Sequence, residues 1–123
     1  MLSDPIAAIA TAPGRAALAI IRLSGDGAFT IAQRVIAGFQ SRPPRQATLA
    51  TFRDSDGRPI DRGVYTVYPG PHSYTGEDLV ELSCHGGRLN AERVLAGLLR
   101  AAGYSLQANA KTREGSVPKE TWW

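Results

Sequence analysis

The sequence contains a single cysteine, Cys84, and no apolar run that approaches 18 residues. One cysteine excludes an internal disulfide and is typical of proteins that stay in a reducing compartment. Without a long apolar run we expect no membrane-spanning helix, and the start MLSDP has no basic segment before an apolar stretch, so no signal peptide is expected. These absences predict a cytoplasmic protein without a membrane partner.

The chain also lacks a strong excess of either charge. Fourteen lysines and arginines stand against 11 aspartates and glutamates, which gives a net charge of +3 over 123 residues. So small an excess does not by itself indicate a nucleic-acid-binding surface. With 43% hydrophobic and 20% charged residues, the composition is ordinary for a globular domain.

Several motifs of catalytic and nucleotide-binding proteins are missing. The pattern G-x-x-x-x-G-K-[ST] does not occur, so this sequence does not bind a nucleotide through a P-loop. The segment SGDGAF (24–29) lacks the third glycine of a dinucleotide-binding motif and indicates the start of a helix instead. One cysteine and two histidines, His72 and His85, do not make a zinc site. We assign no catalytic and no metal-binding residues.

Short apolar segments between prolines and glycines predict strands, and two amphipathic segments predict helices. This order of elements predicts an α+β domain, with a mixed β-sheet and two main helices packed on it. The predicted strands span 6–11, 17–23, 47–52, 60–68, 78–85 and a candidate sixth at 104–108, and the helices begin near 24–26 and 86–87 and end at Gly38 and Gly103.

The strand predicted at 78–85 carries polar residues along one of its faces. Side chains alternate between the two faces of a strand, so Glu81, Ser83 and His85 share one face, while Val80, Leu82 and Cys84 share the other. A cysteine on an apolar face predicts a buried and inert thiol rather than a nucleophile.

Two charged residues stand in otherwise apolar strands, Arg22 at the end of one and Glu81 within another. Each needs a partner, because an unpaired buried charge costs several kcal/mol. One interpretation is that Arg22 and Glu81 pair with each other or with backbone groups. In the other, Glu81 accepts two parallel hydrogen bonds from adjacent N–H donors on a flat ligand such as a pterin or purine, and Arg22 binds a carbonyl or carboxylate of that ligand.

Neighbouring segments add further candidates. Gly86 and Gly87 follow His85 at a predicted helix start, where free backbone N–H groups suit an anionic or carbonyl group. These residues alone favour an ordinary strand-to-helix turn. Tyr74 lies in a loop flanked by proline and glycine, where it either stacks on a flat ligand or covers the edge of the core.

Three segments together resemble the N-terminal domain of the tRNA modification GTPases called MnmE or TrmE. The resemblance covers roughly residues 4–103, and the combination of SYTGED with ELSCHGG is highly specific. The segments are DPIAAIATAPGRAALAIIRLSG (4–25), ATLATFRDSDGRPID (47–61) and PGPHSYTGEDLVELSCHGG (69–87). The resemblance implies a fold similar to the tetrahydrofolate-binding domain of the glycine-cleavage T protein.

The resemblance also implies a cofactor and partners. The family domain binds a tetrahydrofolate derivative, 5-formyl- or 5,10-methylene-tetrahydrofolate, and forms a homodimer. Its folate contacts fall on Arg22 and Glu81, and the further cofactor-binding candidates are Ser83, His85, Gly86, Gly87 and Tyr74. In the full-length family a separate GTPase domain binds GTP, potassium and magnesium. With MnmG (GidA), the protein adds a carboxymethylaminomethyl or aminomethyl group to the wobble uridine of tRNA.

The sequence departs from the family pattern after the second predicted helix. We therefore expect a folate-binding and dimerisation domain over 1–105 and a divergent tail over 106–123. The family's Gly-Gly-Pro is also Gly86-Gly87-Arg88 here. For this chain we expect a non-catalytic binding domain. The alternatives are a one-carbon transferase of the glycine-cleavage T-protein type and a scaffold whose altered tail has abolished folate binding.

Overall fold

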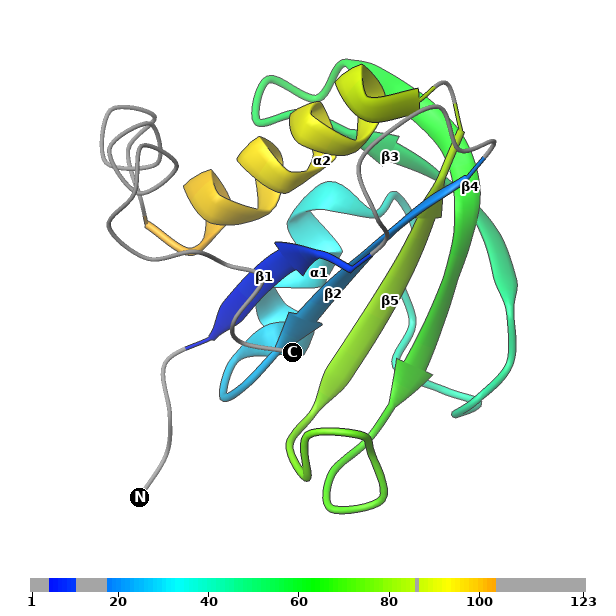
Figure 1. The fold of residues 1–123 in the computed structure, drawn as a ribbon, viewed down its shortest axis with the longest axis vertical. Helices are drawn as coiled ribbons and strands as arrows, with labels where there is room; N and C mark the ends of the chain where they lie inside the picture. The colour runs from blue at the N-terminus through cyan, green and yellow to red at the C-terminus, as the bar shows by residue number, and fades with distance from the viewer. Residues whose placement is uncertain (1–4, 11–17, 86, 104–123) are drawn as a thin grey trace.

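The computed structural model describes residues 5–10, 18–85 and 87–103. The α+β class and the two main helices predicted from the sequence are confirmed (Figure 1). The candidate strand at 104–108 lies outside the described residues. The elements follow in the order β1 (Ile6–Ile9), β2 (Ala19–Ser24), α1 (Ala28–Val35), β3 (Thr48–Arg53), β4 (Pro59–Tyr68), β5 (Leu79–Cys84) and α2 (Gly87–Ala101).

The five described strands form one sheet in the order β1-β2-β5-β4-β3. We expected a mixed sheet, but all four described pairs are antiparallel. A parallel pair needs a crossover between strands that become neighbours. Here the chain passes through α1 from β2 to β3, and these two strands are separated in the sheet by β5 and β4. The helical connection therefore creates no parallel pair.

The first helix begins later than the sequence suggested. We expected its start at Ser24-Gly25-Asp26, but Ser24 is the last residue of β2 and pairs with Leu79 of β5. The helix α1 begins at Ala28, after Gly25 and Gly27 have taken positive φ values of 124° and 80°. The side chain of Ser24 makes a tertiary contact instead of capping the helix.

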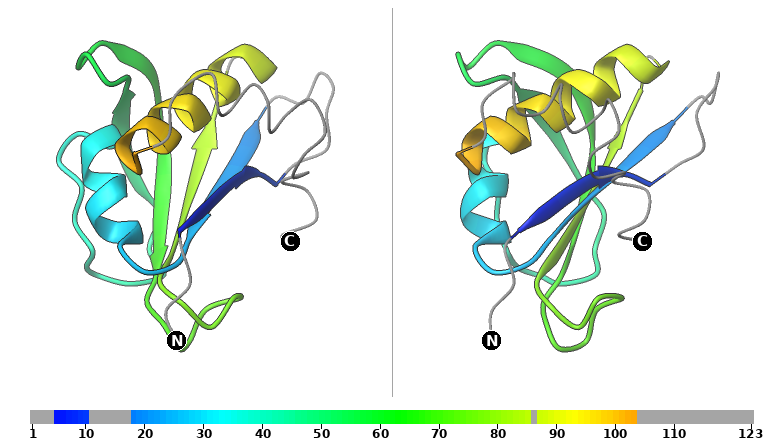
Figure 2. Two further views of the ribbon diagram at one scale, coloured as in Figure 1. Left: turned by 90° about the vertical axis from the view of Figure 1, so that its left-hand side faces the viewer. Right: turned by 60° about the vertical axis from the view of Figure 1, so that its left-hand side comes forward.

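Both helices lie on the same side of the sheet (Figures 1 and 2). Apolar residues repeat along one face of each helix, and alternate strand residues meet them, as the periods of helix and strand require. This packing makes one core cluster. Its largest members include Ile21, Leu23, Ile31, Val35, Phe52, Val67, Val80, Leu82, Val94 and Leu98.

The core is packed closely enough to require a glycine at position 63 of β4. A Cβ atom there would lie 2.2 Å from the backbone oxygen of Ser83 and 2.7 Å from the ring of Phe52. Real Cβ atoms do not approach other atoms so closely. The absence of a side chain at Gly63 therefore lets the Phe52 ring pack directly on β4.

No described helix or strand covers the other side of the sheet, which we call the open face. The cross-strand pairs place its residues in rows that run across the strands. Two of these rows are Leu49–Val64–Ser83–Ile20 and Thr66–Glu81–Arg22–Ala8. The open face thus combines apolar and charged side chains. Across the described ranges, no helix is both long and apolar enough to cross a membrane.

Candidate functional site

Arg22 and Glu81 lie directly opposite each other on the open face. The antiparallel register of β2 and β5 pairs the two residues, and Arg22 Nε donates a hydrogen bond of 2.8 Å to Glu81 Oε2. Their side chains are 29% and 23% exposed. The first interpretation of these residues, that the two charges pair with each other, is therefore confirmed.

The pair leaves Glu81 with capacity to accept further hydrogen bonds. An ionised carboxylate has about four lone-pair positions on its two oxygens. The hydrogen bond from Arg22 uses one of these positions, on Oε2. Glu81 can therefore keep its contact with Arg22 while it accepts hydrogen bonds from a ligand.

Tyr74 lies beside this pair. The centroid of its ring is 5.5 Å from Arg22 Cζ, within the range of a cation–π contact. Its side chain is 72% exposed, so the alternative in which Tyr74 covers the edge of the core is wrong. The ring offers a flat surface next to the two charges, and its stacking on a ligand stays a prediction.

Tyr74 belongs to the loop between β4 and β5, residues 69–78, which extends beyond the sheet at the bottom of Figure 1. The next residue, Thr75, connects the loop to β2: its Oγ1 shares a hydrogen bond of 2.6 Å with Ser24 Oγ. Ser24 is only 3% exposed. The loop is thereby held against the end of the strand that carries Arg22.

The phenol of Tyr68 lies within the electrostatic field of the same pair. Burial raises the pKa of Tyr68, the negative charge of Glu81 raises it further, and the positive charge of Arg22 lowers it. Tyr68 follows Thr66 by two residues on β4, and Thr66 pairs with Glu81, so the tyrosine is a diagonal neighbour of Glu81 on the open face. Sequence reasoning missed this residue because only the strand register brings it close.

The remaining candidates lie farther from Arg22. Ser83 is half-buried on β5, between Val64 and Ile20 in its row. Gly87 is the first residue of α2, and Gly86 lies outside the described residues. No described contact joins Ser83 or Gly87 to the Arg22–Glu81 pair, and the role of all three residues in binding stays a prediction.

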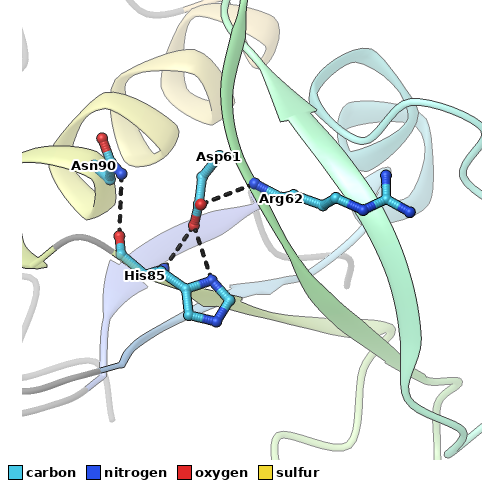
Figure 3. A network of polar contacts seen from close by, with 4 residues as sticks. All are labelled: Asp61, Arg62, His85 and Asn90. Carbon is cyan, nitrogen blue, oxygen red and sulfur yellow. Dashed lines mark hydrogen bonds and ion pairs between the residues drawn. The ribbon is translucent and has the colours of Figure 1, made fainter.

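His85 follows the end of β5 and contacts Asp61 of β4. Its backbone N–H donates to Asp61 Oδ2 at 2.6 Å, and its ring Nδ1 lies 3.5 Å from the same oxygen (Figure 3). Asn90 Nδ2 donates to the backbone oxygen of His85 at 3.1 Å. The described contacts therefore hold His85 at the junction of β5 and α2, apart from Arg22 and Glu81.

Asp61 was not among the residues singled out from the sequence. It pairs across the sheet with the buried Phe52, and Figure 3 shows its carboxylate between the backbones of His85 and Arg62. The only sequence signal was an acidic residue at the start of a predicted strand. Nothing in that pattern indicates a contact with a residue 24 positions away.

Cys84 is fully buried on the helix-covered face, as predicted from its place among apolar residues. Burial, and then the negative charge of Asp61, raises the pKa of the thiol to about 12. The thiol therefore stays protonated at neutral pH, whereas a nucleophile or a metal ligand must be a thiolate. This agrees with the interpretation of Cys84 as an inert core residue.

One hollow of about 430 Å³ lies on another part of the surface. It is formed by α1 and the segment that follows it, and it contains none of the residues of the Arg22–Glu81 site. Its lining residues are Phe29, Thr30, Gln33, Phe39, Gln40, Ser41 and Arg42. The ion pair of Arg22 and Glu81 therefore lies on the open face and not in this hollow.

Comparison with known proteins gives a consistent result. The family described as "GTP-binding protein TrmE N-terminus" matches residues 5–113. A protein of Paracidovorax citrulli named "tRNA modification GTPase MnmE" is 46% identical over 111 residues, which is 90% of this chain and 23% of that protein.

Proteins of the same name from other organisms are similar to an equal degree. Those of Verminephrobacter eiseniae and of a Polaromonas species are 48% and 52% identical over 98 and 99 residues. These matches cover 80% of this chain and 20% of each relative. The chain thus spans about a fifth of the length of the curated relatives it matches.

Proposed function

Because the chain belongs to the family of TrmE N-termini, the N-terminal domain of the tRNA modification GTPase MnmE, we propose that it binds a reduced folate. The ligand we propose is 5-formyl- or 5,10-methylene-tetrahydrofolate. The observation that supports this proposal is the ion pair of Arg22 and Glu81, two half-buried charges on the sheet face that no described helix or strand covers.

The chemistry of the pterin ring matches this pair. One edge of the ring carries an exocyclic amine and a ring N–H side by side, and a carboxylate accepts two such parallel hydrogen bonds. Arg22 holds Glu81 Oε2 at 2.8 Å, which restricts the orientation of the carboxylate before a ligand arrives. The exposed ring of Tyr74 supplies a surface on which a flat heterocycle can stack.

Calorimetric titration with 5-formyltetrahydrofolate tests this proposal. The variant Glu81→Gln loses a charge-assisted hydrogen bond, so its binding free energy should weaken by about 1.5–3 kcal/mol. Arg22→Ala should weaken binding as well. Asp56→Asn is the matched control, because it removes an exposed carboxylate from the turn between β3 and β4. Equal affinity in wild type and Glu81→Gln would refute the role of Glu81.

We also propose that two copies of the chain associate through the open face. Leu49 is 56% exposed and shares a row with the half-buried Val64, Ser83 and Ile20. Leu18, which is 48% exposed, precedes Ile20 by two residues. Contiguous exposed apolar side chains are a feature of protein–protein interfaces. A second copy is the partner that the resemblance to a dimeric family domain implies.

Sedimentation velocity tests this association. Leu49→Glu places a charge in the proposed interface and should shift the chain toward monomer. Leu89→Glu is the matched control: Leu89 is 68% exposed but belongs to α2, on the covered side of the sheet. A wild-type chain that sediments as a monomer at all concentrations would contradict the proposal.

We further propose that the domain serves a longer cytoplasmic protein. That protein would bind GTP, potassium and magnesium in a separate domain and act with MnmG (GidA) on the wobble uridine of tRNA. A chimera in which this chain replaces the matching segment of one of the relatives tests this proposal. Mass spectrometry of the tRNA should detect the modified uridine with the wild-type segment and less of it with Glu81→Gln.

A further inference from the structure

A chain of contacts connects the buried residue Ser24 to the candidate binding site. Ser24 Oγ and Thr75 Oγ1 share a hydrogen bond of 2.6 Å, and Thr75 is adjacent to Tyr74 in the sequence. The Tyr74 ring lies 5.5 Å from Arg22 Cζ, and Arg22 Nε lies 2.8 Å from Glu81 Oε2. The described contacts thus link Ser24 to Arg22 and Glu81 through the loop residues Thr75 and Tyr74.

This series of contacts begins on strand β2, at Ser24, and returns to the same strand at Arg22. Ser24 and Arg22 both belong to β2, two residues apart, and their side chains lie on the same face because strand residues alternate. The loop residue Thr75 contacts the first and its neighbour Tyr74 contacts the second. Two successive loop residues thus meet two successive positions of the open face of β2, which fixes both the position and the orientation of this part of the loop.

Because Ser24 is buried, the loss of its hydrogen bond with Thr75 would be energetically unfavourable. At 3% exposure the hydroxyl has almost no access to water. A buried hydroxyl that loses its partner is left unsatisfied, whereas a surface hydroxyl would simply bind water. Tyr74, at 72% exposure, has no packing of comparable extent to hold it. The position of its ring therefore depends on the adjacent contact of Thr75.

We propose that Ser24 and Thr75 are positioning residues, which hold Tyr74 against Arg22 and so preorganise the binding site. The inference rests on the proposed folate-binding function, and it adds the residues that set the geometry of that site. Neither hydroxyl touches the ligand. Their effect on affinity arises because an ordered loop loses less conformational freedom on binding than a mobile one.

Calorimetric titration of four variants with 5-formyltetrahydrofolate tests the proposal. Ser24→Ala should lower affinity roughly three- to tenfold, the scale of one hydrogen bond. Thr75→Val should have a similar effect, and Thr75→Ser, which keeps the hydroxyl, should restore wild-type affinity. Ser41→Ala is the control, because it removes a hydroxyl from the segment after α1.

A double variant separates positioning from a merely structural effect. If Ser24 acts through Tyr74, then Ser24→Ala should lower affinity in the wild-type background and cause no further loss in Tyr74→Ala. An equal loss of affinity in both backgrounds would overturn the proposal.

A second measurement needs no ligand. The Tyr74 ring should shift the NMR resonance of the Arg22 Nε–H group, and Tyr74→Ala should remove that shift. Ser24→Ala should reduce the shift, whereas Ser41→Ala should not. An unchanged Arg22 resonance in Ser24→Ala would overturn the positioning role. If wild type binds no folate, the proposed function fails, but this measurement still decides whether the hydroxyl pair positions Tyr74.

Discussion

The two faces of the sheet belong to the same strands, but their side chains make different kinds of interaction. On the covered face, side chains such as Phe52, Val80 and Leu82 are completely buried against other apolar groups. On the open face, Arg22 and Glu81 keep about a quarter of their side-chain surface exposed and meet through a hydrogen bond of 2.8 Å. The comparison indicates that the covered face supplies the stability, so that the open face can carry charged side chains.

The largest expected difference between the faces is in stability. Phe52→Ala should lower the free energy of unfolding by about 3–5 kcal/mol, because the ring is fully buried and packs over Gly63. Leu49→Ala, on the open face, should change it by no more than about 0.5 kcal/mol. Urea denaturation measures both. Similar losses for the two variants would break the comparison and would show that the open face is packed as well.

The next effect concerns the reactivity of Cys84. Its pKa is raised from 9.0 to about 12, so at pH 8 the native protein should hold roughly a thousandth of the thiolate of an unperturbed cysteine. A thiol reagent should therefore label the native protein very slowly and the unfolded protein quickly. Rapid labelling of the native chain, absent in Cys84→Ser, would show that the covered face opens readily.

The same shift has a consequence for stability at alkaline pH. The native thiol keeps its proton up to about pH 12, while the unfolded chain releases it near pH 9. The native state therefore binds more protons in this window, and the free energy of unfolding should fall as the pH rises from about 9 toward 12. Denaturation of wild type and Cys84→Ser across this range isolates the contribution of the thiol.

The smallest expected effect is the contribution of the Arg22–Glu81 pair to folding. Partly exposed ion pairs contribute up to about 1 kcal/mol and are screened by salt. A double-mutant cycle with Arg22→Met and Glu81→Gln should therefore give a coupling energy of this size that decreases in high salt. A coupling energy of about 3 kcal/mol, typical of breaking a buried pair, would contradict the view that the open face contributes little to stability.

The local structure was largely predictable from the sequence. The apolar segment at 78–85 predicted the strand observed as β5, Leu79–Cys84. Alternation along it predicted the burial of the Cys84 thiol, because side-chain direction within a strand follows from the backbone alone. The start of α1 was predicted too early, because Ser24 forms a hydrogen bond with Thr75, 51 residues later, and pairs within the sheet. A local pattern does not show that a serine is committed to so distant a partner.

The site was predictable in its charges but not in its geometry. Arg22 and Glu81 stood out because charged residues in apolar strands need partners. That they lie opposite each other follows only from the pairing of β2 with β5, strands that are far apart in the sequence. Tyr68 and Asp61 were missed for the same reason, since their contacts cross from β4 to β5 or to its end.

By itself, the sequence determined the α+β class, the two amphipathic helices and the need of two strand charges for partners, and its motifs placed the chain in the TrmE family. These properties depend on the order of side chains along the backbone. The tertiary structure alone decided the antiparallel strand order, the pairing of Arg22 with Glu81 and the hydrogen bond that holds the loop of Tyr74. Such contacts depend on which distant segments the packing of the core brings together, and no local period of the chain specifies that choice.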